Sequence, residues 1–150
     1  PVPEDVRGRI LDGGRLSGSA VNKQPWRFVV VESAEAKERI AGMVYAAANV
    51  ETCAFAVAIA TEGGGSAIDV GRAMQNMFLT AWNEGVVSCP NGMPDQQAAA
   101  QALGLEDGWL PVNIPSFGYP KRDLAPTSKS AEDWSAEANR RPLDELVRRI

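Results

Sequence analysis

The chain has 150 residues, of which 45% are hydrophobic and 23% are charged, and this composition is ordinary for one compact, soluble domain. We therefore expect a single domain over residues 1–150, in the cytoplasm, because the sequence has no long apolar run and no signal peptide. The net charge of −4 argues against nucleic acid as the main partner, since no basic stripe is available to neutralise phosphates.

The residue types present exclude several classes of catalysis. The chain has no histidine, and its 2 cysteines, Cys53 and Cys89, lack the spacing of a metal site. A His-based zinc site and a Ser-His or Cys-His catalytic unit are therefore excluded. We expect no metal and assign no catalytic residue. What remains is chemistry in which a bound cofactor performs the difficult step and the protein supplies binding and electrostatics.

The first 31 residues predict one helix and one strand. The helix begins at Pro3-Glu4-Asp5 and ends before Gly13-Gly14. Its inward-facing residues are Val6, Ile10 and Leu11. Residues 26–31 are rich in β-branched and aromatic side chains, which predicts a strand.

A second helix and a second strand follow. Residues 34–48 place Ile40, Val44 and Ala47 at helical spacing and predict a helix. Residues 53–60 alternate large and small apolar residues with period two, which predicts a strand with one bulky face and one alanine face. A helix packed on that alanine face could approach very closely. Gly63-Gly64-Gly65 then predicts a loop.

The clearest structural prediction is a helix from Ala67 to Glu84. Ser66 and Asp69 resemble a capping box at its start, and Gly85 suits the position just after its end. Six apolar residues at helical spacing form one stripe: Val70, Ala73, Met74, Met77, Phe78 and Ala81. The stripe predicts a buried helix, and a core helix without a partner is sufficient to explain it.

The remaining elements are shorter. Another helix is expected from Pro94-Asp95 through Leu103. Residues 109–117 predict a strand that Pro111 and Pro115 interrupt, and hence an edge strand or a partly irregular one.

The most informative stretch is Ser19 to Trp26, between the first helix and the first strand. Ser19, Asn22 and Gln24 supply short neutral donors and acceptors for a polar ligand. Gly18 lets the backbone approach such a ligand closely, and Pro25 stops any helix. An ordinary helix-to-strand connection is the competing interpretation, because Ser, Asn and Pro are common in any loop.

Three separated motifs match one family in the right order. The pattern Ser-x-x-Asn-x-Gln-Pro-Trp over residues 19–26 resembles the signature of the nitroreductase family of flavoproteins. Residues 69–92, and Gly118-Tyr119-Pro120 with the tail 139–147, are similar to later motifs of that family. The resemblance implies an α+β fold: a three-layer α/β/α sandwich with a central mixed, mostly antiparallel sheet. It further implies an intertwined homodimer that binds flavin mononucleotide (FMN) across its interface, with helix 67–84 forming much of that interface.

The resemblance also implies three groups of FMN-binding residues. The first group is Ser19, Ala20, Asn22 and Gln24. The second is Pro90, Asn91 and Gly92, whose backbone faces the reactive edge of the flavin with an N–H near N5. The third is Arg140 and Arg141, whose guanidinium groups suit the phosphate.

Each group has a competing interpretation in the residues themselves. Pro-Asn-Gly is a common turn sequence, and an arginine pair near a chain end is usually a solvated charge pair. Cys89 lies where a thiol could approach a flavin, but the role of a buried small hydrophobic residue suits it better. Members of the family carry an Arg-rich N-terminal helix that grips the FMN phosphate, ahead of the segment that opens this chain at Pro1-Val2-Pro3. We expect either a truncated chain or a protein without that phosphate anchor.

The function that the resemblance implies is an FMN-dependent oxidoreductase. It would take hydride from NADH or NADPH onto flavin N5 and pass it to a nitroaromatic, quinone or other small electron-poor acceptor. Protons could come from water, so the absence of histidine is no obstacle. Two alternatives stay open: another flavin reaction, such as dehalogenation or flavin cleavage, and a degenerate homodimer that acts as a flavin-binding, storage or other non-catalytic binding protein.

Overall fold

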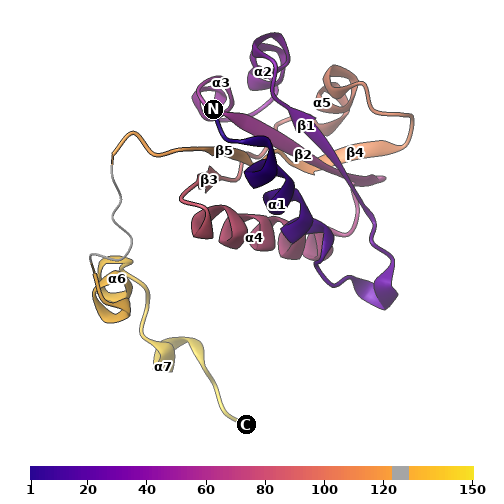
Figure 1. Ribbon diagram of the computed structural model, residues 1–150. Helices are drawn as coiled ribbons and strands as arrows, with labels where there is room; N and C mark the ends of the chain where they lie inside the picture. The colour runs from indigo at the N-terminus through magenta and orange to yellow at the C-terminus, as the bar shows by residue number, and fades with distance from the viewer. Residues whose placement is uncertain (123–128) are drawn as a thin grey trace. The chain divides into compact units, whose positions relative to one another are not determined.

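The computed structural model describes residues 1–122 and 129–150 of the chain (Figure 1). It contains two compact units, Pro1–Pro120 and Lys121–Ile150, each of which is described here by itself. The expectation of one domain over residues 1–150 stays a prediction. The elements of the first unit are α1 (Glu4–Arg15), η1 (Ala20–Asn22), β1 (Trp26–Val31), α2 (Ala34–Ala41), α3 (Ala47–Glu51), β2 (Phe55–Glu62), α4 (Ala67–Asn83), β3 (Val87–Cys89), α5 (Gln96–Leu103), β4 (Trp109–Asn113) and β5 (Ser116–Gly118). Those of the second are α6 (Ala131–Glu137) and α7 (Leu143–Leu146).

The strands form one sheet in the order β1-β2-β5-β3, with β4 also paired to β2. Strand β2 pairs with β1 from Trp26 opposite Thr61 to Val31 opposite Ala56. Its pairings with β4 and β5, and that of β3 with β5, are also antiparallel. The expected mostly antiparallel sheet is therefore confirmed, and β1 and β3 are the two ends of its path.

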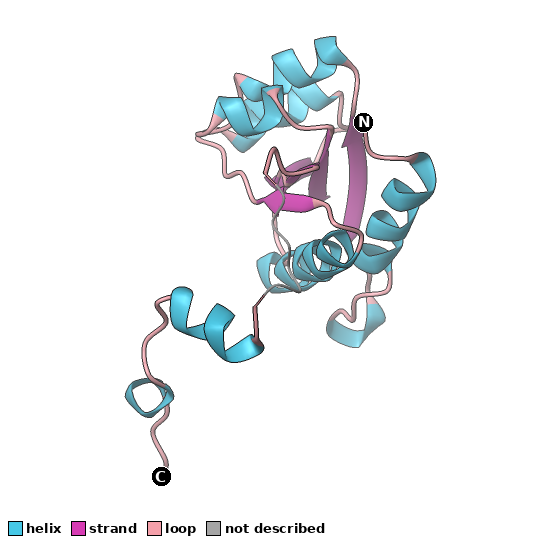
Figure 2. Cartoon of the chain, turned by 60° about the vertical axis from the view of Figure 1, so that its left-hand side comes forward, coloured by secondary structure: helices cyan, strands magenta, loops and turns pink. Residues whose placement is uncertain are grey.

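Strand β2 divides the core of the first unit into two layers, as its sequence alternation predicts. Phe55, Val57 and Ile59 are fully buried in the cluster that includes α1 and α4. Ala56 and Ala58 are fully buried on the other face, in the cluster that includes residues of α2 and α3. Figure 2 shows the sheet between these two helical layers. The expected three-layer α/β/α sandwich is confirmed.

Helix α1 continues through Gly13 and Gly14 to Arg15, so the prediction that it ends before the two glycines is wrong. A Cβ at Gly13 would lie 2.4 Å from Thr80 Oγ1, and a Cβ at Gly14 would lie 2.3 Å from Met77 Cε. The glycines therefore permit a close crossing of α1 and α4. Gly13 and Gly14 therefore serve the packing of two helices and do not mark the end of α1.

The predicted helix over residues 34–48 is broken into α2 and α3, with a turn from Gly42 to Ala46. At this turn the Tyr45 N–H donates to the Gly92 carbonyl oxygen at 3.0 Å. In a continuous helix that N–H would donate to the carbonyl four residues earlier, so a tertiary hydrogen bond replaces a helical one. Ile40, Val44 and Val50 still share one buried cluster.

Helix α4 spans Ala67–Asn83, close to the expected bounds, and its two ends differ in how well the sequence predicts them. The capping box at Ser66 is wrong: Ser66 has a φ of 59° and its side chain makes no capping hydrogen bond to the described helix. An N-cap side chain reaches the first turn from an extended backbone, which Ser66 lacks. At the other end Gly85 has a φ of 71°, and the N–H groups of Gly85 and Val86 donate to Trp82 and Ala81. This is a Schellman ending, which the glycine predicts.

The later elements follow the sequence closely. Helix α5 begins after Asp95, whose carboxylate accepts from the N–H groups of Gln97 and Ala98 at 2.9 and 3.0 Å. The predicted strand 109–117 is split into β4 and β5 at Ile114 and Pro115, as the prolines indicate. Helix α6 of the second unit has a capping box at Ser130, and none of the described residues 129–150 is buried.

The lengths of the helices bear on the expected location of the protein. Among the described residues there is no helix of the length and apolar character needed to cross a bilayer. The cytoplasmic location stays a prediction.

The glycines of α1 provide a matched stability test. A Cβ at Gly8 would meet no other side chain within 4 Å among the described residues, whereas a Cβ at Gly13 would meet Thr80. Gly8→Ala should raise the free energy of unfolding by about 0.5–1 kcal/mol through helix propensity, and Gly13→Ala should lower it by about 1–3 kcal/mol through overpacking. Urea unfolding followed by circular dichroism measures both values. Equal stabilisation by the two substitutions would contradict the close crossing of α1 and α4.

Candidate functional site

The polar segment, residues 19–24, is anchored to the fold at its start. The Ser19 hydroxyl accepts from the Gln24 N–H at 2.8 Å, which closes the segment on itself. The Ala20 N–H donates to Asp69 Oδ1 of α4 at 3.3 Å. Because Asp69 is buried, it ties the segment to a rigid helix. The predicted residues Ser19, Ala20, Asn22 and Gln24 thus lie together in one short loop.

Three residues of the polar segment hold a left-handed backbone. The φ values are 45° at Val21, 56° at Asn22 and 49° at Gln24. Left-handed residues other than glycine are uncommon, and a β-branched residue there is an outlier. Val21, Asn22 and Gln24 are all exposed. Strained backbone of this kind concentrates at ligand sites and switch regions, where it sets side chains in a required direction.

The loop of Pro90, Asn91 and Gly92 is held by a cluster of amide side chains, which we call the amide cluster: Asn49, Asn91 and Asn113. Asn91 is 2% exposed, and its Nδ2 donates to the Ile114 carbonyl at 2.8 Å. Asn49 Nδ2 donates to Asn91 Oδ1 at 2.9 Å, and the Asn91 N–H donates to Asn113 Oδ1 at 3.0 Å. Asn91 therefore supports the loop from inside the protein and leaves Pro90 and Gly92 at its surface.

Gly92 carries an unused donor. Its carbonyl accepts from the Tyr45 N–H, but its own N–H has no acceptor among the described residues. The residue is only partly exposed. Backbone N–H groups that are partly withdrawn from water normally have a partner. Gly92 thus offers one fixed donor to an acceptor atom of a ligand.

The two cysteines occupy different surroundings. Burial raises the pKa of the Cys53 thiol above its usual value, which keeps it protonated and makes it a poor nucleophile. Cys89 ends β3 next to the loop, and its sulfur accepts from Asn49 Nδ2 at 3.4 Å. Cys89 is partly buried, as expected for a small residue that packs beside the loop.

The polar segment and the loop of residues 90–92 lie at opposite edges of the sheet. The segment leads into β1 and the loop follows β3, which stand at the two ends of the strand order (Figure 1). Three interstrand steps of roughly 4.8 Å put about 14 Å between these edges. One protomer therefore does not bring the two groups of predicted residues together.

The third predicted group lies in the second unit, between α6 and α7. Arg140 Nη1 donates to the Ala138 carbonyl at 2.9 Å, and Arg141 Nε pairs with Glu145 Oε2 at 3.2 Å. Both arginines are exposed. Because each unit is described by itself, the structure does not place the two arginines against the other predicted groups.

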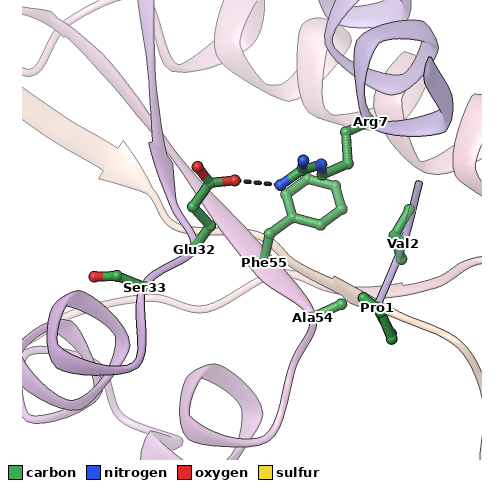
Figure 3. A pocket seen from close by; sticks show the side chains of 7 residues that line it. All are labelled: Pro1, Val2, Arg7, Glu32, Ser33, Ala54 and Phe55. Atoms are coloured by element: carbon green, nitrogen blue, oxygen red, sulfur yellow. Dashed lines mark hydrogen bonds and ion pairs between the residues drawn. The ribbon is translucent and has the colours of Figure 1, made fainter. Parts of the chain in front are cut away.

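Arginines of the first unit are engaged by carboxylates. Each of its arginines is ion-paired: Arg7, Arg9, Arg15, Arg27, Arg39 and Arg72. Figure 3 shows one example, in which Arg7 reaches Glu32 beside a cavity of about 470 Å³. An oxyanion that bound at one of these guanidinium groups would have to compete with a carboxylate.

A second cavity, of about 450 Å³, adjoins the polar segment. Lys23, Gln24 and Pro25 line one part of it. Trp109 contributes another part, and the Arg27 guanidinium lies 3.9 Å from the centre of the Trp109 ring.

Sequence reasoning missed three residues around Gly92: Tyr45, Asn49 and Asn113. Tyr45 was hidden by the prediction of one helix over residues 34–48, and Asn113 by the strand prediction over 109–117. Asn49 lies just past that predicted helix and was assigned no role. A signal was present at Gly42, because a glycine inside a helical pattern lowers the expectation of a continuous helix.

Comparisons with known proteins find one matching family. The sequence profile described as the nitroreductase family matches residues 1–63 and 60–119. A protein of Methanothermobacter thermautotrophicus, named as a candidate NADH dehydrogenase/NAD(P)H nitroreductase, is 26% identical over 129 residues, which cover 79% of this chain and 68% of that protein.

Solved structures show the same fold. A nitroreductase family protein from Clostridium novyi NT is 25% identical, with a TM-score of 0.74 over 81% of this chain and 77% of that one. A nitroreductase with bound FMN from Bacteroides fragilis is 20% identical, with a TM-score of 0.68 over 87% of this chain and 84% of that one. The family profile covers well over half of the chain and includes residues 19–26 and 69–92, whereas the tail 139–147 lies outside it. The chain belongs to the nitroreductase family.

Proposed function

We propose that the chain is an FMN-dependent oxidoreductase that passes hydride from NAD(P)H, by way of flavin N5, to a small electron-poor acceptor such as a nitroaromatic or a quinone. The observation that carries this proposal is the Gly92 N–H, which has no acceptor among the described residues and lies on a loop that the amide cluster holds in place. A fixed backbone donor of this kind suits a ring nitrogen whose charge changes during a reaction.

The described residues fit FMN in two respects. The polar segment presents neutral donors and acceptors on an exposed, strained backbone, and Gly92 presents an N–H without bulk. The cofactor agrees with family membership and with the FMN-bound structure from Bacteroides fragilis. The name of the Methanothermobacter relative agrees with NAD(P)H as the reductant. When bound, FMN supplies hydride acceptance and hydride donation.

Three groups of residues would bind different parts of the cofactor. Ser19, Asn22 and Gln24 would hydrogen-bond the cofactor, and Pro90 would keep the loop rigid so that the Gly92 N–H keeps its direction. Arg140 and Arg141 would hold the phosphate by charge-assisted hydrogen bonds, with Arg141 released from Glu145. Water could supply the protons, so the absence of histidine is no obstacle.

We further propose that a homodimer completes the site. The two groups of residues lie at opposite edges of one sheet, and in this proposal a partner protomer supplies one of them. Helix α4 offers a surface for that partner: beside its buried stripe, Ile68, Leu79 and Trp82 are 82%, 60% and 46% exposed. Exposed apolar residues gathered along one helix are typical of a surface that another protein covers.

A non-catalytic homodimer that binds or stores flavin is the second candidate. The observation that favours it is the pairing of each arginine of the first unit with a carboxylate, which leaves few cations for a phosphate there. Weak phosphate binding would reduce FMN affinity without changing the fold.

Steady-state kinetics separate the two candidates. We expect the FMN-loaded protein to oxidise NADH or NADPH in the presence of menadione, with parallel double-reciprocal lines, because the two substrates would use one pocket in turn. Intersecting lines would contradict this sequence of binding. A flavin-loaded sample that does not oxidise NAD(P)H would support the non-catalytic candidate instead.

The polar segment can be tested without adding backbone strain. Asn22 has a φ of 56°, so Asn22→Gly removes its amide while it keeps a conformation that glycine tolerates. We expect FMN binding to weaken by roughly 1–3 kcal/mol, about tenfold to a hundredfold in Kd, with the fold retained. Titration of apo-protein with FMN, followed by flavin fluorescence, measures this change. Lys23→Ala in the same loop is the control; equal affinities in both variants and the wild type would exclude Asn22 from the site.

A further inference from the structure

The second cavity, which adjoins the polar segment, lies where the ends of three strands meet. Trp26 at the start of β1 is opposite Thr61 of β2. Glu62 at the end of β2 is opposite Trp109 at the start of β4. These pairings gather the polar segment and two strand ends around a space of about 450 Å³. The described residues that line it include one cation, Lys23, one carboxylate, Glu62, and one aromatic ring, Trp109.

The ammonium group of Lys23 is free to meet a ligand. Lys23 is exposed, and it makes no hydrogen bond or ion pair with a described residue. The other basic side chains of residues 1–120 are engaged: each arginine is ion-paired, and Lys37 donates to the Cys53 carbonyl at 2.8 Å. At the cavity beside Arg7, for example, an anion would have to displace Glu32 (Figure 3). Lys23 therefore offers the second cavity a positive charge that no carboxylate holds.

Trp109 gives the same cavity a fixed aromatic wall. The Arg27 guanidinium lies 3.9 Å from the centre of the Trp109 ring. Arg27 is itself held by Glu106, with 3.1 Å between Nη1 and Oε2. The ring is only partly exposed, so its orientation is set by the protein before a ligand arrives. Nucleic-acid bases stack well on aromatic side chains, and a purine is a suitable neighbour for Trp109.

We propose that the second cavity binds the adenosine end of the reductant and that Lys23 selects NADPH over NADH by pairing with the 2′-phosphate. This inference rests on the proposed function, in which the polar segment holds FMN and the nicotinamide meets the flavin. NADH and NADPH differ only in the phosphate on the adenosine ribose, so a protein that selects NADPH needs a cation beside that ribose. Lys23 directly follows Asn22 of the polar segment, and a dinucleotide that extends from the flavin along this segment reaches the cavity.

Glu62 lies in the same lining and acts in the opposite direction. It is exposed, and it forms no ion pair with Lys23 or with another described residue. Neither charge is therefore neutralised by the other in the empty cavity. A 2′-phosphate would be attracted by Lys23 and repelled by Glu62. Removal of each charge should consequently change the affinity for the phosphate in opposite directions.

Calorimetric titration tests the inference without turnover. FMN-loaded protein is titrated with adenosine 2′,5′-bisphosphate and with adenosine 5′-monophosphate, which differ only in the 2′-phosphate. The wild type should bind the bisphosphate more tightly. Lys23→Gln should weaken bisphosphate binding by about three- to tenfold, the range expected for one charge-assisted contact, and should leave the monophosphate unchanged. Lys23→Arg should bind like the wild type, and Glu62→Gln should bind the bisphosphate more tightly.

Two further variants test the location of the site. Trp109→Leu should weaken binding of both adenosine ligands by a similar factor, because it removes the aromatic wall and no charge. Glu38→Gln removes an exposed carboxylate from α2, outside the cavity, and is the matched control for Glu62→Gln. Equal gains in bisphosphate affinity in Glu38→Gln and Glu62→Gln would point to net charge alone and overturn the inference.

Turnover adds a second readout. In Lys23→Gln the ratio of kcat/KM for NADPH to that for NADH should fall by the same factor as the bisphosphate affinity. Equal bisphosphate affinity in Lys23→Gln and the wild type would overturn the inference, as would a wild type that binds the two adenosine ligands equally. A wild type whose bisphosphate binding depends on Lys23 but that does not oxidise NADPH would contradict the proposed function and would still support the phosphate site.

Discussion

Burial of strand β2 on both faces is the constraint from which the rest of the first unit follows. Val57 and Ile59 fill the layer toward α1 and α4, and Ala56 and Ala58 admit α2 and α3 closely on the other side. A central strand of this kind has its backbone groups paired with neighbours on both edges. Strands β1 and β3 lie at the two ends of the sheet order.

That separation shapes the proposed function. The polar segment precedes one edge strand and the loop of residues 90–92 follows the other. Contacts within the protomer fix the conformation of each. The polar segment has a strained backbone and a hydrogen bond to Asp69, and the buried side chain of Asn91 holds the loop. In the proposed homodimer, neither is a complete site by itself. Dimerisation would bring the polar segment of one protomer to the loop of residues 90–92 of the other. The stability of the dimer and the affinity for the cofactor would then be linked.

Much of the fold could be predicted because its signals are local. The periodicity of β2, the glycine ending of α4 and the family motifs depend on residues close in sequence. The wrong predictions are those in which a tertiary contact overrides a local signal. Gly13 lies where α1 crosses α4 and does not end its helix, and beyond Gly42 the Tyr45 N–H donates to Gly92 and not to a helical carbonyl. For the candidate site, the family resemblance names residues 19–24 and 90–92. It does not indicate that Asn91 supports its loop from inside or that Tyr45 lies beside it, since their partners are many residues away.

The proposed function requires that FMN binds where two protomers meet. Sedimentation velocity of the FMN-loaded protein, followed at the flavin absorbance band over a dilution series, tests it directly. We predict that flavin absorbance sediments with the dimer and is released as the dimer dissociates, and that Leu79→Glu, which puts a charge on the exposed face of α4, releases it at higher protein concentration. Gln101→Glu, an added charge on exposed α5, should behave like the wild type. Flavin that sediments with a monomer at undiminished occupancy would contradict the account.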